Sequence, residues 1–255
     1  MAKKYLGQNF LYDPSILNRI IQIAQLDRED LVVEIGPGTG RLTKMLAEKV
    51  ENVVAIELDD KLFAKLKIEL AEYHNVELIH GDALKYFYES LPQFKVVSNI
   101  PYYITTPIIF RLIKAKENLE SMTLTVQKEV AERIVAKPGG KDYGVLSLMV
   151  QYHAKPKLEF IIPKGAFRPV PKVDSAVVHI EILERPSVLV KDENFFFRVI
   201  KTAFSQRRKM LYNSLKSLHE DVKEKLVELG IDPNRRPETL SIQEFARLSD
   251  ILKRD

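Results

Sequence analysis

The stretch that decides the fold is Glu34-Ile35-Gly36-Pro37-Gly38-Thr39-Gly40, which follows the apolar run 31–35 and precedes a helical pattern over 42–50. Glycines at a turn from a strand into a helix let a ligand lie against the backbone without Cβ clashes. A dinucleotide site has the spacing GxGxxG, whereas this turn reads GxGxG with a glutamate before it. The pattern therefore favours S-adenosylmethionine, which has no pyrophosphate to place on the helix N-terminus.

Strands and helices alternate through the first two thirds of the chain. Short apolar runs predict strands at 31–35, 53–58, 76–80, 96–98, 122–126, 158–162 and 175–183. Helical periodicity covers 16–26, 42–50, 59–72, a segment starting near Thr105, 128–136 and 144–152, and Asp13-Pro14-Ser15 is a start signal for the first of these helices. This alternation predicts an α/β fold, a mostly parallel Rossmann-like sheet with helices on both faces. The last two strands lack an intervening crossover helix, which predicts an antiparallel hairpin at one edge.

The pattern changes at Arg185-Pro186. Residues 193–252 show helical periodicity throughout, broken at Gly230 and at Asp232-Pro233, and this indicates a small bundle of about four helices. We therefore expect two domains, 1–183 and 184–255.

Composition limits the kinds of partner and ligand that this protein can bind. The net charge is +4 and the pI is near 9.0, and positive residues cluster at Lys3-Lys4, Lys137 with Lys141, Lys164 with Arg168 and Lys172, and Arg207-Arg208-Lys209. Such patches suit a polyanion better than a membrane, with scattered solvated charge as the alternative. The absence of cysteine excludes disulfides and thiolate metal sites, and the five histidines show no ligand spacing, so we expect no metal.

The sequence also bears on membranes and self-association. No apolar run approaches the roughly 18 residues of a membrane span, and the N-terminus lacks the apolar core of a signal peptide. We expect a cytoplasmic protein with no membrane partner. No apolar stripe demands a partner subunit, so we also expect a monomer.

Polar groups stand at the ends of three further strands. Glu57 ends the second predicted strand, where a carboxylate can accept both hydroxyls of a ribose. Asp82 follows the third and can accept from an adenine amino group, and Asn99 ends the fourth. Singly, Glu57 and Asp82 are more often helix caps. Together with the glycine turn they predict one crevice at the carboxyl edge of the sheet, with a methyl donor as its ligand.

The segment Asn99-Ile100-Pro101-Tyr102 predicts how a flat base is held beside that donor. The Asn99 side-chain oxygen and the Ile100 carbonyl would accept the two hydrogens of the base's amino group. Pro101 fixes the chain direction and has no N–H to compete. Tyr102 would stack on one face of the base and Phe167 would close the other. Core packing of Tyr102 and loop anchoring by Phe167 are the alternatives.

Five segments, in this order and spacing, carry a family resemblance: 4–11, 34–40, 99–102, 167–175 and 204–209. With them the chain closely resembles the ribosomal RNA adenine N6-dimethyltransferase family over essentially its whole length. Within that family it is most similar to the bacterial small-subunit branch, whose loss confers kasugamycin resistance.

The resemblance implies dimethylation of two adjacent adenosines in a hairpin loop near the 3′ end of 16S rRNA, in the small ribosomal subunit or its precursor. It implies methyl-donor contacts at Asn9, Leu11, Gly36, Glu57, Asp82 and Asn99. From the residues alone, 8–11 is an amphipathic arm folded over the ligand.

The helical tail offers a candidate RNA surface. Lys201, Arg207, Arg208 and Lys209 lie on one basic stretch, although a solvated helix face is the alternative. We therefore expect 1–183 to hold the donor and catalyse transfer, and 184–255 to select the RNA.

Three other functions share some of these features. An erythromycin-resistance methylase of 23S rRNA has the same catalytic motifs, but the tail and segment 167–175 favour the small-subunit branch. A DNA adenine methyltransferase is disfavoured because no sequence-reading domain can be placed. An RNA-binding assembly factor with secondary catalysis, or a transcription factor like some organellar relatives, is disfavoured by the intact cofactor residues.

Overall fold

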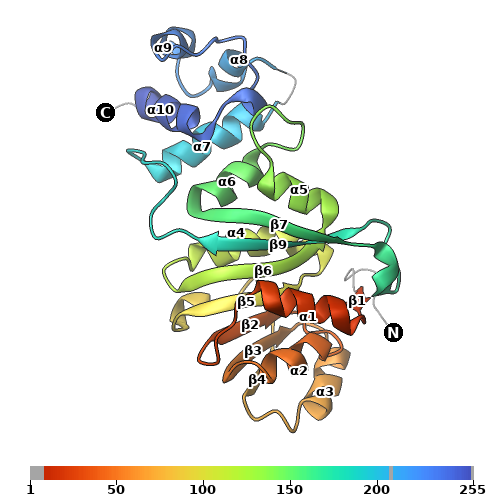
Figure 1. Ribbon diagram of the computed structural model, residues 1–255. Helices are drawn as coiled ribbons and strands as arrows, with labels where there is room; N and C mark the ends of the chain where they lie inside the picture. The colour runs from red at the N-terminus through yellow and green to blue at the C-terminus, as the bar shows by residue number, and fades with distance from the viewer. Residues whose placement is uncertain (1–8, 207–208, 254–255) are drawn as a thin grey trace. The chain divides into compact units, whose positions relative to one another are not determined.

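The computed structural model describes residues 9–206 and 209–253 (Figure 1). The chain divides into two compact units. The first consists of the residues up to Ala131 together with Lys155–Ile182, and the second of Glu132–Ala154 together with the residues from Leu183 onward.

A seven-stranded sheet forms the centre of the first unit, in the order β4-β3-β2-β5-β6-β9-β7 from bottom to top in Figure 1. Its strands are β2 (Leu31–Ile35), β3 (Asn52–Glu57), β4 (Val76–His80), β5 (Phe94–Asn99), β6 (Leu119–Gln127), β7 (Ala154–Ile162) and β9 (Ser175–Ile182). Strands β2 to β6 pair in parallel, and β9 runs antiparallel to β6. The prediction of a mostly parallel, Rossmann-like sheet with an antiparallel edge hairpin is confirmed.

Helices cover both faces of this sheet. Val32 and Val33 are both fully buried although neighbouring strand residues point to opposite faces, so each face has its own apolar cover. The helices are α1 (Pro14–Ile23), α2 (Arg41–Ala47), α3 (Asp60–Glu69), α4 (Thr105–Lys114) and α5 (Lys128–Val135), the last of which passes from the first unit into the second. Helix α1 begins where the sequence predicts, because the Asp13 carboxylate accepts the Ser15 N–H at 2.9 Å.

A second, two-stranded sheet is not predicted by the sequence. Strand β1 (Phe10–Leu11) pairs antiparallel with β8 (Phe167–Arg168), so that Phe10 lies opposite Arg168 and Leu11 opposite Phe167. Within the segment expected to be an arm over the ligand, Phe10 and Leu11 are therefore fixed by backbone pairing to a partner more than 150 residues later in the chain.

The second unit is helical. Its helices are α6 (Val145–His153), α7 (Glu193–Phe204), α8 (Leu211–Leu215), α9 (Val222–Glu228) and α10 (Ile242–Leu252). The last four match the expected bundle of about four helices. The segment 132–154, expected in the first domain, belongs to this unit because Tyr143, Leu148 and Tyr152 are buried in one cluster with side chains of α7 and α10.

Within 9–206 and 209–253, no helix is long and apolar enough to cross a membrane. The same residues contain no group of three or more His, Asp or Glu side chains placed to hold a metal ion.

Candidate active site

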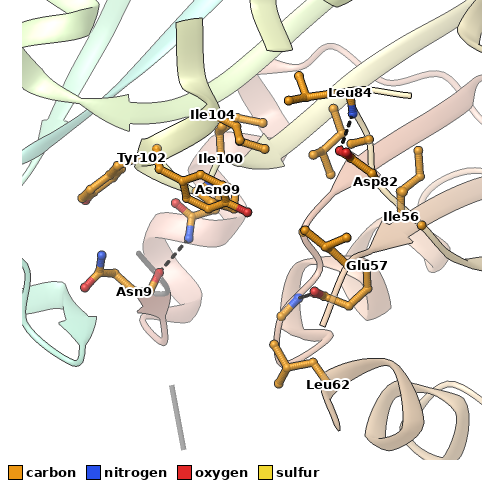
Figure 2. A pocket seen from close by; sticks show the side chains of 18 of the residues that line it. Asn9, Ile56, Glu57, Leu62, Asp82, Leu84, Asn99, Ile100, Tyr102 and Ile104 are labelled. Carbon is orange, nitrogen blue, oxygen red and sulfur yellow. Dashed lines mark hydrogen bonds between the residues drawn. The ribbon is translucent and has the colours of Figure 1, made fainter. Parts of the chain in front are cut away.

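A cavity opens in the first unit at the carboxyl ends of β2, β3, β4 and β5 (Figure 2). Gly36, Glu57, Asp82 and Asn99, the four strand-end residues singled out from the sequence, all line it. Parallel strands end at one edge of their sheet, which is why residues up to 63 positions apart come together here. Figure 2 shows Asn99 and Tyr102 on one side of the cavity and Glu57 and Asp82 on the other.

The turn after β2 requires glycine. Gly36, Gly38 and Gly40 have φ angles of +69°, +60° and +74°, a region that other residues rarely adopt. A Cβ on Gly38 would lie 2.7 Å from a ring carbon of Phe10, and one on Gly36 would lie 3.3 Å from Pro101. The side chains of Phe10 and Pro101 therefore pack closely against this turn, and neither glycine can be replaced without a clash or a strained backbone.

Glu57 is held in place by backbone donors. The N–H of Gly38 donates to one carboxylate oxygen at 3.2 Å, and the N–H of Asp59 donates to the other at 2.8 Å. Burial nevertheless raises the pKa of the Glu57 carboxyl above its usual value. Each carboxylate oxygen has a second lone pair, so the side chain can still accept two hydroxyl groups from a ligand.

Asp82 is also oriented by the backbone. One of its carboxylate oxygens accepts the Leu84 N–H at 2.9 Å, drawn in Figure 2, in a short turn after β4. The second oxygen has no such restraint and is available to a ligand amino group. The half-buried Asp82 thus lies at the cavity wall with one oxygen fixed and one free for recognition.

Leu11 and Glu34 lie at a smaller hollow beside the main cavity. It is lined by Leu11, Glu34, Gly36 and Asn99 among others. Leu11 is buried, and Glu34 is buried with one carboxyl oxygen that has no hydrogen-bond partner. Burial raises the pKa of Glu34 to about 8, against a smaller opposing effect of the Thr43 hydroxyl. The acidic residue before the glycine turn is thus an interior group.

Asn99 has a fixed orientation. Its side-chain nitrogen lies 3.1 Å from the backbone carbonyl oxygen of Asn9. A carbonyl only accepts, so the amide nitrogen must face Asn9, and the side-chain oxygen is left as an acceptor. The Ile100 N–H donates to the Thr125 carbonyl at 3.1 Å, which holds the next peptide in line with the sheet. This is the acceptor arrangement that an amino group of a base would need.

Tyr102 lines the same cavity with a half-buried ring. Its hydroxyl lies 2.6 Å from the Oγ of Ser175, the fully buried first residue of β9. Burial raises the pKa of Tyr102, so the phenol is neutral at physiological pH. Ser175 is a partner that the sequence did not indicate: it lies within one of the family segments, but no local pattern connects it to a residue 73 positions earlier.

Phe167 lies elsewhere. Its side chain is fully buried in the cluster that contains Leu17 and Ile20 of α1, and it does not line the cavity. This corrects the expectation that its ring closes the second face of a base. The physical reason is that β8 pairs with β1, which turns Phe167 into the apolar layer under α1.

The expected RNA-binding residues belong to the second unit. Lys201 is exposed on α7, and Lys209 is exposed in the segment that follows it. Arg207 and Arg208 lie outside the described residues.

Sequence comparison finds one family along the whole chain. The model of the family described as ribosomal RNA adenine dimethylase matches residues 1–254. A curated relative from Clostridium acetobutylicum, named ribosomal RNA small subunit methyltransferase A, is 47% identical and covers 98% of this chain and 94% of its own. The protein of the same name from Clostridium botulinum (strain Loch Maree / Type A3) is 49% identical and covers 98% and 93%.

Structural comparison separates the dimethyladenosine transferases from the 23S rRNA methyltransferases less clearly than sequence comparison does. A dimethyladenosine transferase from Plasmodium falciparum is similar with a TM-score of 0.78 and 29% identity, covering 94% of this chain and 95% of its own. The 23S rRNA methyltransferase ErmE is similar with a TM-score of 0.75 and 27% identity, covering 96% and 99%. Fold similarity barely separates these two, whereas sequence identity is much higher to the small-subunit relatives.

Proposed function

Because the chain belongs to the ribosomal RNA adenine dimethylase family, we propose that it transfers methyl groups to the N6 amines of two adjacent adenosines. These lie in a hairpin loop near the 3′ end of 16S rRNA, in the small ribosomal subunit or its precursor. The methyl donor is S-adenosylmethionine. The enzyme acts in the cytoplasm as a monomer, without a metal.

One observation carries this proposal. Residues suited to a nucleoside-bearing donor and residues suited to an acceptor base line a single cavity, with Glu57 and Asp82 opposite Asn99 and Tyr102 (Figure 2). A transfer reaction needs both substrates in one enclosed space. Correct alignment of two reactants accounts for about 7–11 kcal/mol of a barrier.

The chain's residues fit the donor. Gly36 and Gly38 line the cavity without side chains, so a ligand can lie against the backbone of this turn. Glu57 has a free lone pair on each oxygen for the ribose hydroxyls, and Asp82 keeps one oxygen for the adenine amine. Asn9 completes the site in the main cavity, Leu11 does so in the smaller hollow, and Asn99 lines both. When bound, S-adenosylmethionine supplies an electrophilic methyl group on a sulfonium.

The acceptor side lowers the barrier through hydrogen bonds to the amine. The N6 nitrogen is neutral, so no strong base is needed before attack. Its lone pair is delocalised into the ring, however, and it must become tetrahedral to react. The oxygen of Asn99, with the Ile100 carbonyl, accepts the amine hydrogens and stabilises the positive charge that develops on the nitrogen. Pro101 contributes no competing N–H at this point.

The base is held by stacking on Tyr102. A stacked base gains about 1–3 kcal/mol, which offsets part of its extrusion from the RNA. The bond from the Tyr102 hydroxyl to Ser175 fixes the ring on the wall of the cavity. RNA selection lies in the helical unit, where Lys201, Arg207, Arg208 and Lys209 contact phosphates.

Labelled-methyl transfer to purified small and large ribosomal subunits from cells lacking both modifications tests this function. We expect label only in 16S rRNA, recovered as N6,N6-dimethyladenosine. Asn99→Ala should abolish transfer, and it should weaken S-adenosylhomocysteine binding without abolishing it, because Glu57 and Asp82 still hold the donor. The matched control is Asn75→Ala, which loses two hydrogen bonds to backbone carbonyls at 2.8 Å outside the cavity and should still transfer.

The other outcomes point to different functions. Label in 23S rRNA would assign the protein to the erythromycin-resistance type. An absence of label in either subunit, with normal donor binding, would indicate an RNA-binding assembly role. Near-normal turnover by Asn99→Ala would remove Asn99 from the mechanism.

A further inference from the structure

Tyr88 is a fully buried residue close to the candidate active site, but it does not line the cavity. It begins a short 3-10 turn (Tyr88–Ser90) in the irregular segment that connects Asp82 to β5. Burial raises the pKa of its phenol, which therefore stays protonated and can donate a hydrogen bond.

The Tyr88 hydroxyl reaches the cavity wall through one peptide group. It donates to the carbonyl oxygen of Ala83 at 3.0 Å. That carbonyl belongs to the same planar peptide as the Leu84 N–H, which donates to the Asp82 carboxylate at 2.9 Å. The peptide 83–84 is thus held at both ends, by a phenol on one side and by a carboxylate on the other. Hydrogen bonds arranged in series through a peptide polarise one another.

The ring of Tyr88 is itself locked. The guanidinium of Arg111 on α4 lies over it, with its central carbon 5.1 Å from the ring centre. Arg111 in turn makes two bonds of 2.6 Å to the Glu89 carboxylate and one of 2.6 Å to the Tyr86 carbonyl. The ring also stacks with Phe94 of β5, with 6.1 Å between ring centres. The hydroxyl therefore has little freedom to move away from Ala83.

We propose that Tyr88 is a positioning residue for recognition of the donor's adenine: through the 83–84 peptide it fixes the rotation of the Asp82 carboxylate, so that the unbonded oxygen of Asp82 faces the exocyclic amine. The inference rests on the proposed function, since Asp82 is assigned there to the adenine. Its distinctive consequence concerns selectivity. If Tyr88 acts only by aiming Asp82, then loss of its hydroxyl affects ligands that carry the amine and spares ligands that lack it.

Calorimetric titration with two ligands tests this consequence. One is S-adenosylhomocysteine, and the other is S-inosylhomocysteine, in which a carbonyl oxygen replaces the amine. We expect the wild-type protein to prefer the adenosyl ligand. Tyr88→Phe should weaken that ligand about fivefold, the usual effect of losing one neutral hydrogen bond. It should change the affinity for the inosyl ligand by no more than about twofold, so that the preference for the adenosyl ligand becomes smaller.

Two further variants sharpen the test. Tyr86→Phe is the matched control, because the structure gives its hydroxyl no hydrogen bond to any described residue, and its preference should equal that of the wild type. In an Asp82→Asn background, Tyr88→Phe should have no further effect on selectivity, since both changes act on one contact.

Each contrary result is distinct. Equal weakening of both ligands by Tyr88→Phe would mean a general loosening of the site and would overturn the inference. Unchanged affinity for both would do the same. Failure of the wild-type protein to bind S-adenosylhomocysteine would instead overturn the donor assignment on which the inference rests.

Discussion

Replacement of Gly38 by alanine should damage the protein in two separable ways. The first is conformational: alanine at a φ of +60° costs about 1–2 kcal/mol because its Cβ approaches the following carbonyl oxygen. The second is steric. The new Cβ would lie 2.7 and 2.9 Å from two ring carbons of Phe10, where carbon atoms normally stay about 3.5–4.0 Å apart. Forcing an extra methyl into a packed position typically costs about 1–3 kcal/mol more.

Gly230 provides the matched control for the conformational part. It has a φ of +70°, and a Cβ built on it meets no atom within 4 Å. Gly230→Ala should therefore lower the free energy of unfolding by about 1–2 kcal/mol, and Gly38→Ala by about 2–5 kcal/mol. In a Phe10→Ala background, the cost of Gly38→Ala should fall to that of the control, because the clashing ring is gone.

Donor binding provides the second measurement. Gly38 gives its N–H to the Glu57 carboxylate, and Phe10 follows directly after Asn9, whose carbonyl holds the Asn99 amide. Displacement of either segment disturbs the cavity, so Gly38→Ala should weaken S-adenosylhomocysteine at least about tenfold by calorimetry, equivalent to about 1.4 kcal/mol. Gly230→Ala should bind it normally. The reasoning fails if the two variants unfold alike and bind the ligand equally well.

The cavity and the basic stretch of the helical unit lead to three further expectations. Tyr102→Phe and Ser175→Ala should each lower kcat/KM about fivefold. The double variant should be no worse than either single variant, because both changes remove the same hydrogen bond. Additive losses in single-turnover assays would contradict a role for the hydrogen bond between Tyr102 and Ser175. The raised pKa of Glu34 means that the folded state keeps a proton that the unfolded state releases, so the melting temperature should fall as pH rises from 4.5 towards about 8. Glu34→Gln should flatten that fall, and an unchanged profile would argue against the buried acid. Replacing Lys201, Arg207, Arg208 and Lys209 by glutamine should weaken RNA binding. The slope of the logarithm of the binding constant against the logarithm of the salt concentration should also become shallower, by about 0.7–0.9 for each phosphate that the protein no longer neutralises. An unchanged slope would mean that these residues have no role in binding.

Local patterns in the sequence predicted the features that local physics determines. The apolar runs placed β2 to β6 to within a few residues, and Asp13-Pro14 placed the start of α1. The strand-end residues Glu57, Asp82 and Asn99 could be grouped because parallel strands share one carboxyl edge, so strand order alone brings them together.

Pairings between distant segments could not be predicted in this way. The pair β1–β8 has only two residues in each strand, which is too short for any alternation of apolar and polar residues. The bond between Tyr102 and Ser175 joins residues from different strand ends, and neither residue type indicates the other. Segment 132–154 was placed by its position between predicted strands, yet its apolar side chains are buried with those of α7 and α10.

The β1–β8 pair shows why such distant pairings matter for the site. Phe10 packs over Gly38 on the donor side, while the carbonyl of Asn9 orients the amide of Asn99 on the acceptor side. Both residues belong to one short stretch of backbone, and that stretch is held because Leu11 lies opposite Phe167. Phe167 anchors its own strand in the apolar layer under α1. It therefore supports the acceptor site from a distance, through β1, and a substitution there should disturb the orientation of Asn99 without removing any group from the cavity.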